Sequence, residues 1–417
     1  DNGDGFQGAP LGEILPGEGG THPLARAFQV LEYDAIGLGN HDFDIGLELL
    51  SRALADVPCP VLCANLMALA AECALPFEPS VILERQLPGG EGLTPLRIFE
   101  TRYHDMVRGK VLQAQLRATG IVETALQQAR DLKAAGCDVV LALAHTGLST
   151  QGRPDSSENV LEQLVALPLI DAVVGGHTHL TLPDPEHPFD KPVVMPGSHG
   201  SHLGIIDLWF EYEAARGWQR ASGSARLRPV ADTGSCGRVN ILAAEAPALQ
   251  RALAEDHART LERMRRPAGY SSVAMHSYFT FFAPDRGLAL VGSAQAAAVR
   301  PLLAQGAAAD LPLLSAVAPC KFGGRSGPQF YTDIAAGDLS ARNIADLQVF
   351  PNELRVITVS GAQLRDWLEM SAGLFTHLVP GSCGQRLTDP QRAGHNFDVI
   401  FGLNYRIDPS QPPRFSA

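Results

Sequence analysis

The sequence lacks the features that would place it among membrane, disulfide-rich or nucleic-acid-binding proteins. No apolar run in its 417 residues approaches the roughly 18 residues that a transmembrane helix needs. Its 7 cysteines are scattered without CxxC pairs, so neither a disulfide scaffold nor a zinc ribbon is indicated. Basic residues are outnumbered, with 33 Lys and Arg against 45 Asp and Glu and a formal charge of −12. A stable nucleic-acid complex is therefore not expected, and any phosphate must be held by a local site.

The remaining composition describes a folded chain that is long enough for two domains. Hydrophobic residues make up 45% and charged residues 19% of the sequence, which is typical of proteins that form a core. The chain begins at Asp1, within the turn-like segment Asp1-Asn2-Gly3-Asp4, and not at a methionine. We therefore expect a piece of a longer protein, with room for an export signal before Asp1. The sequence sets no oligomeric state and is compatible with a monomer.

Short apolar runs alternate with helical stretches in the first half, which predicts a layered α/β domain. Apolar residues at helical spacing predict a helix over 121–135 that stops at Gly136. The expected strands are residues 35–38, 139–144, 169–174, 193–195 and 205–209. Polar residues repeatedly follow the ends of these strands, which is where open α/β sheets usually assemble their sites.

The middle of the chain has a different pattern. Residues 215–240 are rich in Gly, Arg and Ser and lose the apolar rhythm, and residues 243–264 predict one exposed, charged helix. We interpret this stretch as a connector between two domains. In the second half, Leu354–Val359 is expected to be a strand, and Ser360 is expected to cap an amphipathic helix.

A set of potential metal ligands is the most informative feature of the sequence. Its members occupy four separate loops: Asp4, Asn40, His41, Asp42, Asp44, His145, His177 and His179. Carboxylate, amide and imidazole donors suit Zn²⁺, Mn²⁺ or Fe²⁺ better than a purely oxygen-ligated Ca²⁺ site. A bridging carboxylate can hold two such ions ~3.5–4 Å apart, where they activate a water and clamp a phosphoryl group. Any one of these residues alone would fit an ordinary loop histidine or turn-forming aspartate, but the ordered set favours a site.

These motifs resemble those of the calcineurin-like metallophosphoesterases. They are Asp1-Asn2-Gly3-Asp4, Gly39-Asn40-His41-Asp42, Ala144-His145-Thr146-Gly147 and Gly175-Gly176-His177-Thr178-His179. Most of the chain is similar to the 5′-nucleotidase group, and above all to the bifunctional 2′,3′-cyclic-nucleotide 2′-phosphodiesterase/3′-nucleotidases. The segments that carry this closer resemblance are residues 4–12, 202–208, 314–316, 323–325, 342–347 and 396–400.

The resemblance implies an α/β architecture, with α+β layering, in three parts. Residues 1–232 would form a metallophosphoesterase β-sandwich flanked by helices, and residues 233–266 would contain a linker helix. Residues 267–417 would form a second, smaller α/β nucleotide-binding domain, the 5′-nucleotidase C-terminal domain. Both domains would be incomplete, because the family's first strand, with its Asp-x-His ligands, would precede Asp1. A second base-stacking aromatic is expected beyond the other end.

The resemblance also implies roles for the ligand set. Asp4 would bridge two divalent ions (Zn, Mn, Co or Mg). Asn40, His145 and His177 would complete the shell of one ion, and His179 would contribute to the other. His41 would stabilise charge that develops on the phosphoryl group or leaving oxygen, with Asp44, or alternatively Asp42, fixing its orientation.

The second half offers candidate substrate contacts. The resemblance and the chemistry of the side chains together select Gly323, Gly324, Arg325, Arg342, Asn343 and Phe350. Glycines permit close backbone approach, and a guanidinium matches phosphate oxygens bidentately. Phe350 occupies the position where the family stacks an aromatic ring on the nucleobase. A surface arginine and a core phenylalanine are the alternatives that the residues alone leave open.

The function that the resemblance implies is metal-dependent hydrolysis of 2′,3′-cyclic nucleotides and 3′-nucleotides in the periplasm or outside the cell. A 5′-nucleotidase or nucleotide-sugar hydrolase is the alternative within this class. A non-catalytic nucleotide-binding module is the alternative outside it, because the Asp-x-His motif is not in this sequence.

Three further features remain open. His199 and His202 would be groups near the metal site or ordinary loop histidines. Cys59 and Cys63 are expected to be buried thiols one helical turn apart. Residues 88–118 depart from the family pattern, and residues 95–103 within them are reminiscent of a Lon-type substrate-binding domain. We interpret this segment as a divergent surface insertion.

Overall fold

The computed structural model describes most of the chain as two compact units. It describes all residues except 7, 14–19, 70–75, 88–95, 104–114, 150–157, 234–238, 305, 307, 325, 326, 328, 350, 351, 353, 390, 391, 413, 416 and 417. The first unit is Asp1–Thr260 and the second is Leu261–Ala417. The division falls inside the helix α7 (Pro247–Met264).

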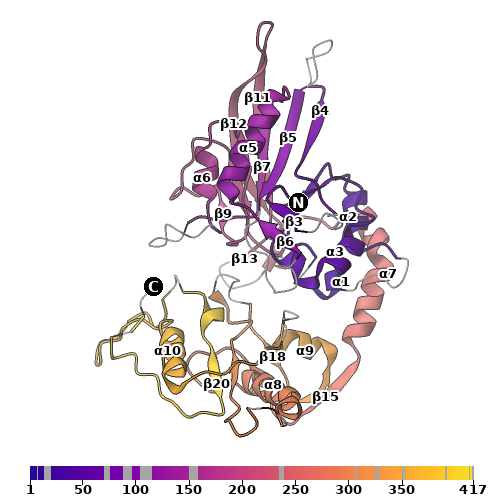
Figure 1. Cartoon of the computed structure of the whole chain (residues 1–417). Helices are drawn as coiled ribbons and strands as arrows, with labels where there is room; N and C mark the ends of the chain where they lie inside the picture. Colours follow the sequence, from indigo (N-terminus) through magenta and orange to yellow (C-terminus); the bar gives the residue numbers. More distant parts are fainter. Residues whose placement is uncertain are drawn as a thin grey trace. The chain divides into compact units, whose positions relative to one another are not determined.

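A six-stranded sheet forms the centre of the first unit. Its strands, in spatial order, are β4 (Ser80–Arg85), β5 (Leu96–Tyr103), β7 (Val139–Ala144), β8 (Ala172–Val174), β10 (Val193–Pro196) and β9 (Thr181–Leu182). The neighbours from β5 to β10 pair in parallel, whereas β4 and β9 add antiparallel edges, and Figure 1 shows β4, β5 and β7 side by side. β7 is apolar and buried along nearly its whole length, as expected for a parallel strand covered on both faces.

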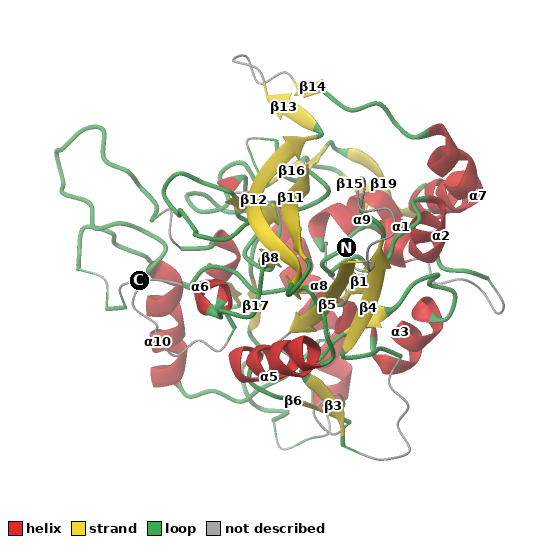
Figure 2. Ribbon diagram, turned by 90° about the horizontal axis from the view of Figure 1, so that it is seen from above, coloured by secondary structure: helices red, strands yellow, loops and turns green. Residues whose placement is uncertain are grey.

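Two helices cover this sheet and close its core. α5 (Ile121–Ala134) packs against β5 and β7, and α6 (Leu161–Ala166) packs against β8 (Figures 1 and 2). Their buried side chains join those of β7, β8 and β10 in one hydrophobic cluster. The helix predicted over 121–135 is confirmed, and Gly136 follows it with φ of 83°, the left-handed conformation that glycine adopts without strain.

A second cluster lies under the chain's first segments. It involves α2 (Pro23–Val30), β1 (Ile36–Gly37), the 3₁₀ helix η1 (His41–Ile45), α3 (Leu47–Leu54), β2 (Val61–Leu62), β3 (Leu66–Ala68) and β6 (Leu116–Ala118). A short helix α1 (Pro10–Glu13) precedes these elements, β1 pairs in parallel with β2, and β3 pairs antiparallel with β6. Leu38 and Phe43, which precede and follow residues 39–42, are fully buried. The hydrophobic core therefore fixes both ends of the motif that contains Asn40 and His41.

The interpretation of residues 215–240 as a connector is wrong. β12 (Gly217–Pro229) pairs antiparallel with β11 (His202–Glu213) along almost its whole length, and β13 (Ala231–Thr233) pairs with β14 (Val239–Ile241). Most side chains of β12 are exposed, so the strand is held by its backbone ladder rather than by burial. A strand without a buried face has no apolar alternation, which is why the sequence pattern missed it.

The predicted helix over 243–264 is confirmed as α7, but it is not wholly exposed. Asp256 of α7 is 2% exposed and lies 3.3 Å from the guanidinium of Arg26 on α2. This ion pair, in which only the carboxylate is buried, fixes the end of α7 that belongs to the first unit to the first segments of the chain. No helix among the described residues is long and apolar enough to cross a membrane.

Two smaller expectations for the first unit are also wrong. Cys59 and Cys63 are not on a helix, because they flank the short strand β2; Cys63 is buried and Cys59 half-buried. Residues 96–103 are not a surface insertion, because they form β5 between β4 and β7 in the main sheet. Only the pairing with β4 and β7 reveals that inner position. The rest of 88–114 lies outside the described residues.

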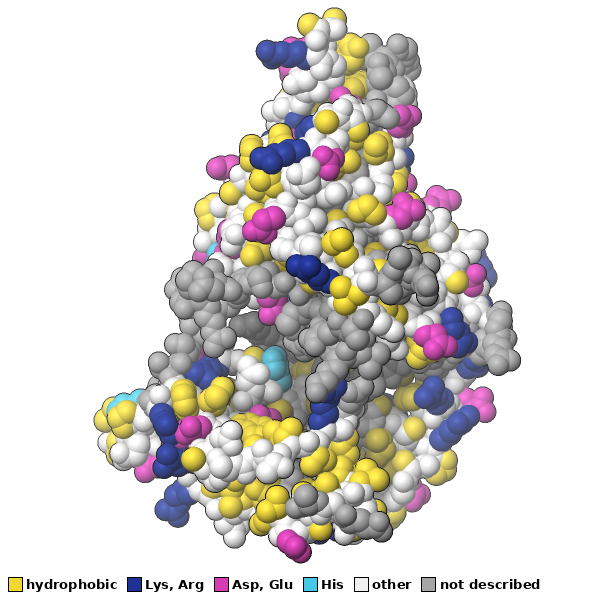
Figure 3. Space-filling model, in the orientation of Figure 1, with side chains coloured by type: hydrophobic (Ala, Val, Ile, Leu, Met, Phe, Trp, Pro, Cys, Tyr) yellow, Lys and Arg dark blue, Asp and Glu magenta, His cyan; other side chains and the backbone are white. Residues whose placement is uncertain are grey.

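Short paired strands and helices build the described part of the second unit. β15 (Pro267–Ser271) pairs with β19 (Gly337–Ser340), β16 (Met275–His276) with β18 (Asp333–Ile334), and β17 (Ser315–Val317) with β20 (Val399–Phe401). The helices are α8 (Arg286–Leu303), α9 (Ala341–Leu347) and α10 (Gly361–Ala372), and a 3₁₀ turn η3 covers Gly394–Asn396. Its core cluster is small, and hydrophobic side chains gather on its visible face in Figure 3.

The strand expected at Leu354–Val359 is wrong, whereas the helix after it is confirmed. Residues 354–359 have no regular structure, and Val356 and Ile357 are 49% and 67% exposed. Without burial or a paired neighbour among the described residues, β-branched composition does not make a strand. Ser360 caps α10 through a capping box with Gln363, as the sequence predicts.

Acid is expected to weaken the first unit through His22. This residue is 1% exposed and caps α2: its Nδ1 accepts a hydrogen bond from the Leu24 amide, and its Nε2 lies 2.9 Å from the Gly12 carbonyl. Burial lowers the pKa of His22 below the ordinary histidine value of about 6.5, so the unfolded chain binds more protons. The stabilisation is therefore complete above pH 6.5 and is lost as the pH falls towards the lowered pKa.

Urea unfolding between pH 8 and 5 checks this expectation. His22→Asn, which keeps a capping side chain but cannot titrate, should flatten the acid slope. The exposed His187→Asn is the control and should leave the slope as in the natural chain. Identical slopes in all three proteins would contradict the role of His22.

Candidate functional site

Three of the four predicted ligand loops begin where a strand ends. The fourth, which contains Asn2 and Asp4, is hydrogen-bonded to the ends of two of these strands. His145 follows β7, His177 follows β8, and Asn40 follows β1. The Asn2 side-chain amide donates to the carbonyls of Ala144 (3.3 Å) and Val174 (3.2 Å), the ends of β7 and β8. The sheet edge therefore gathers the loops, as in other open α/β folds.

Asp4 lies where these loops meet. The amide of His41 donates to Asp4 Oδ1 (2.9 Å), and Asp4 Oδ2 is 2.7 Å from His145 Nε2. Burial alone would raise the pKa of the Asp4 carboxyl, but the hydrogen bond and charge of His145, with a smaller effect of His41, lower the pKa below its ordinary value. Asp4 is therefore a stable anion at the centre of the cluster.

The orientation of His145 is fixed from its other side. Its Nδ1 lies 2.8 Å from the Asn2 carbonyl oxygen, so Nδ1–H donates there and Nε2 is the nitrogen that faces Asp4. The ring is only 6% exposed. A carbonyl behind one nitrogen and a carboxylate in front of the other is the arrangement seen around metal-ligating histidines.

His177 and Asn40 form a second contacting pair. His177 Nδ1 is 3.1 Å from Asn40 Oδ1, and the rings of His145 and His177 have centroids 5.5 Å apart. The other nitrogen of His177, Nε2, lies 2.8 Å from a carboxylate oxygen of Glu158. The structure thus brings Asp4, Asn40, His145 and His177 together from four loops.

His41 and its neighbouring carboxylates have distinct surroundings. His41 Nδ1 lies 2.8 Å from Asp44 Oδ2 within η1, so Asp44 is the carboxylate that orients the ring. Asp42 is instead 1% exposed and accepts hydrogen bonds from the amides of Asp4, Phe6 and Gly39. Asp42 ties the loop of Asp4 to the loop of Asn40 and does not touch His41 through any of these bonds.

His179 belongs to the same region with a different neighbour. Its ring centroid is 6.4 Å from that of His199, and both side chains are exposed. His179 also interacts electrostatically with Asp4, His145 and His177. His199 therefore lies beside a predicted ligand, whereas the Nδ1 of His202 contacts the Ser201 hydroxyl at 2.9 Å.

Backbone strain is concentrated at this cluster. Among the described non-glycine residues, five have positive φ, and four of them are Asp4 (59°), His177 (69°), His179 (59°) and His199 (54°). Such a conformation costs of order 1–3 kcal/mol per residue and persists only where the surroundings enforce it. The positive φ angles thus lower the stability of the fold but direct these side chains to the ligand cluster.

The carboxylate, amide and imidazole groups of the cluster are suitable ligands for divalent metal ions. In this structure, however, they contact each other in pairs. No three His, Cys, Asp or Glu side chains in the described part of the chain already surround one point. Two ligands on one tetrahedral ion at ~2.1 Å would lie about 3.4 Å apart. The pairs Asp4–His145 (2.7 Å) and Asn40–His177 (3.1 Å) are closer than that, so their side chains would have to separate, Asp4 and His145 the more, to hold an ion.

Replacing Gly39 by alanine is expected to abolish metal binding by displacing Asp4. A Cβ at Gly39 would lie 2.0 Å from Asp4 Oδ1 and 2.7 Å from its backbone nitrogen, which forces the loops apart. Overpacking of this kind costs about 1–3 kcal/mol in stability. The control Gly12→Ala meets only ordinary contacts at 3.5 Å and should bind Mn²⁺ as the natural chain does. Calorimetric titration with Mn²⁺ and a melting curve check both variants; unchanged affinity in Gly39→Ala would contradict the expectation.

The substrate-contact candidates of the second unit are described only in part. Arg325 and Phe350 lie outside the described residues. Gly323 and Gly324 have φ of 74° and 63°, and a Cβ on Gly323 would lie 2.5 Å from the Tyr331 hydroxyl, so this position requires glycine. Arg342 is exposed on α9. The remaining candidate, Asn343, accepts from the backbone amide of Ser340 and closes the capping box of α9.

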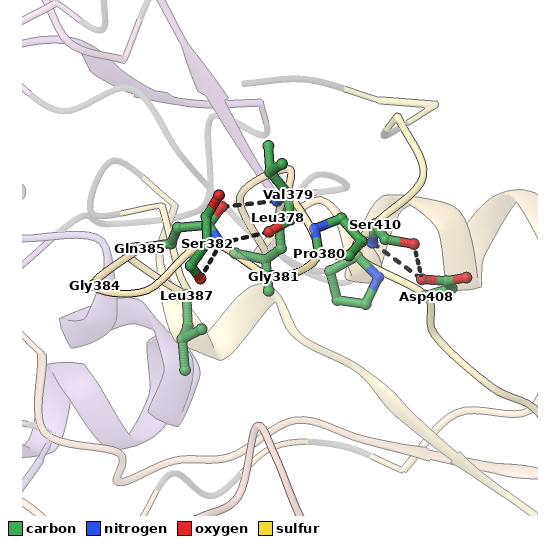
Figure 4. Close-up of a pocket in the computed structure, with 11 residues that line it drawn as sticks. Leu378, Val379, Pro380, Gly381, Ser382, Gly384, Gln385, Leu387, Asp408 and Ser410 are labelled. Atoms are coloured by element: carbon green, nitrogen blue, oxygen red, sulfur yellow. Dashed lines mark hydrogen bonds between the residues drawn. The ribbon is translucent and has the colours of Figure 1, made fainter.

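An open pocket of about 420 Å³ lies elsewhere in the second unit (Figure 4). Residues 378–382, 384, 385, 387 and 408–410 line it, and none of the described candidate residues is among them. Its polar side chains bond their own loop: Gln385 contacts the backbone of Val379 and Ser382, and Asp408 accepts from Ser410. Gln385 and Asp408 are therefore engaged within their own loops, and the ligand cluster of the first unit is the better candidate site.

Three residues of the site were not predicted from the sequence. Asn2 bridges strand ends, Thr146 bridges the loops after β7 and before α6, and Glu158 contacts His177. Asn2 and Thr146 stand inside the recognised motifs, so their position was a usable signal. Glu158 follows the stretch 150–157 and has no local pattern that marks it.

Comparisons with known proteins identify the family of the chain. Residues 290–415 match the protein family described as the 5′-nucleotidase C-terminal domain. The chain is 35% identical over 446 residues to the 2′,3′-cyclic-nucleotide 2′-phosphodiesterase/3′-nucleotidase of Salmonella typhimurium, covering 100% of this chain and 68% of that protein. It is 33% identical over its full length to the trifunctional nucleotide phosphoesterase protein YfkN of Bacillus subtilis, of which it spans only 30%.

A solved structure gives the same result for the fold. The crystal structure of the calcineurin-like phosphoesterase YfkN from Bacillus subtilis matches with a TM-score of 0.54 and 29% identity. The match covers 63% of this chain and 83% of that one.

Proposed function

This chain belongs to the family of 2′,3′-cyclic-nucleotide 2′-phosphodiesterase/3′-nucleotidases, and we propose that it hydrolyses phosphoesters of nucleotides at the ligand cluster of its first unit. The observation that carries the proposal is the convergence of Asp4, Asn40, His145 and His177 from four loops. The preferred substrates would be 2′,3′-cyclic nucleotides and 3′-nucleotides, the compounds that the relatives' names specify.

The proposed roles follow from the contacts. Asp4, Asn40, His145 and His177, with His179, would hold two divalent ions of the Zn, Mn, Co or Mg type. Bound divalent ions supply an activated water and neutralise phosphoryl charge. Asp4 remains anionic, because its contact with His145 lowers the pKa of its carboxyl despite burial. His41, oriented by Asp44, would stabilise the charge that develops on the phosphoryl group or the leaving oxygen.

The second unit would present the nucleotide. The family match over 290–415 supports this assignment, and the left-handed glycines 323 and 324 allow close approach of a ligand to the backbone. Arg325, Arg342, Asn343 and Phe350 remain proposed contacts for phosphate, ribose and base. We place residues 1–232, 233–266 and 267–417 in the roles of catalytic domain, linker and substrate domain. The enzyme would work in the periplasm or outside the cell, as expected for this group.

A 5′-nucleotidase activity is the second candidate, since the family matched by residues 290–415 carries that name. Release of phosphate from 2′,3′-cyclic AMP, 3′-AMP and 5′-AMP with Mn²⁺ or Zn²⁺ separates the two. Preference for the first two supports the proposal, and preference for 5′-AMP supports the alternative. Tight nucleoside binding without turnover of any of the three would instead indicate a non-catalytic binding module.

A further inference from the structure

We propose that Glu158 is a positioning residue that holds His177 with its Nδ1 directed at the metal site. The inference rests on the proposed function, because it concerns how a proposed ligand is aimed. It starts from the contact between Glu158 Oε1 and His177 Nε2 at 2.8 Å, which joins two loops 19 positions apart in the sequence. These side chains are 32% and 18% exposed, so the pair is partly shielded from water.

The two contacts of the His177 ring compete for one proton. Nε2 faces a carboxylate oxygen, and Nδ1 faces the Asn40 amide oxygen at 3.1 Å, and both oxygens are acceptors. A neutral imidazole has a single N–H and satisfies only one of them. With the proton on Nε2 donated to Glu158, the lone pair of Nδ1 faces the Asn40 oxygen, so Nδ1 and this oxygen would both be available to hold a divalent cation.

The backbone of Glu158 is fixed independently of this contact. The buried hydroxyl of Thr146 donates to the Glu158 carbonyl (2.6 Å) and accepts from the Val160 amide (2.9 Å). The Gly176 amide in turn donates to the Thr146 carbonyl (3.1 Å). The loop that carries His145 therefore places the backbone of Glu158 beside the loop that carries His177, within reach of the His177 ring.

The arrangement is a carboxylate–histidine pair behind a metal ligand. Such a partner fixes the tautomer and orientation of the ring and raises its basicity, and its loss typically weakens metal binding about 10–100-fold. Because His177 has φ of 69°, its backbone is strained, and the hydrogen bond to Glu158 helps to hold the ring in its unusual direction. Glu158 needs no contact with substrate to act in this way.

Mn²⁺ affinity of the full 417-residue chain gives the first test. Glu158→Ala should weaken the tightest Mn²⁺ site about 10–100-fold. Glu158→Gln keeps an acceptor oxygen and should recover most of the affinity. Glu162→Ala is the matched control, since Glu162 lies four residues on and its carboxylate accepts from Ser149 instead. Natural affinity in Glu158→Ala would overturn the proposal, and equal losses in the Ala and Gln variants would mark Glu158 as a direct ligand.

The metal-free protein gives a second, independent readout. A His177 imidazole N–H donated to Glu158 should exchange slowly with water in ¹⁵N-histidine spectra, assigned with His177→Gln. The signal should persist in Glu158→Gln and Glu162→Ala and disappear in Glu158→Ala. A protected signal in Glu158→Ala, or none in the natural chain, would refute the hydrogen bond. If the natural chain failed to bind Mn²⁺, the proposed function would fail, whereas the spectrum would still decide the role of Glu158.

Discussion

Asp4→Asn is expected to remove metal binding and nucleotide hydrolysis together. The substitution keeps the shape of the side chain but removes the negative charge that faces His145 Nε2 at 2.7 Å. An amide is a far weaker ligand for a divalent cation than a carboxylate, and it cannot bridge two ions through paired anionic oxygens. Because loss of a mere supporting group costs about 10–100-fold in affinity, loss of the central anion should cost more than ~100-fold.

Metal content after dialysis and phosphate release from 3′-AMP measure this effect. The control is Asp184→Asn, which changes a half-buried loop carboxylate of the same unit whose described contacts are local, with the His187 ring and the Glu186 amide. Melting curves should show that both variants are folded. Retention of metal and turnover in Asp4→Asn would remove Asp4 from the centre of the site.

His41→Ala is expected to separate turnover from metal binding. His41 would act on the phosphoryl group or leaving oxygen and not on the ions, so its loss should lower turnover about 10²–10⁴-fold. Metal content should stay near that of the natural chain, because the side chain is outside the ligand pairs. Asp44→Asn should cause a smaller loss, since it removes only the charged partner of Nδ1 at 2.8 Å.

Steady-state kinetics with 3′-AMP and metal analysis of the same samples decide the matter. An equal loss of metal and turnover in His41→Ala would contradict its assigned role and make it a ligand. A loss in Asp44→Asn greater than that in His41→Ala would show that Asp44 acts by itself.

The comparisons confirm the family and the fold that the motifs implied. The calcineurin-like fold of the first unit and the 5′-nucleotidase C-terminal domain of the second were both expected from short motifs. The helices ending near Gly136 and starting after Ser360 were also predictable, because each carries a local signal, a stop glycine or a capping serine. Local signals of this kind need no knowledge of distant neighbours.

Elements held by distant partners were predicted poorly. The sequence of β12 resembles a connector because its side chains are mostly exposed and its stability comes from pairing with β11. The sequence of β5 does not reveal its inner place, because that place depends on β4 and β7. The predicted strand at 354–359 failed for the opposite reason: its apolar residues are not buried. Strand formation depends on neighbours more than on composition.

The sequence by itself determined the chemistry: which carboxylate, amide and imidazole groups are present, and in which ordered motifs. Only the tertiary structure decided how they are used. It selected Asp44 rather than Asp42 as the partner of His41, because Asp42 is buried among three backbone amides. It also placed Glu158 behind His177, because a side chain's neighbours in space depend on how the loops are joined through the sheet and not on their distance along the chain.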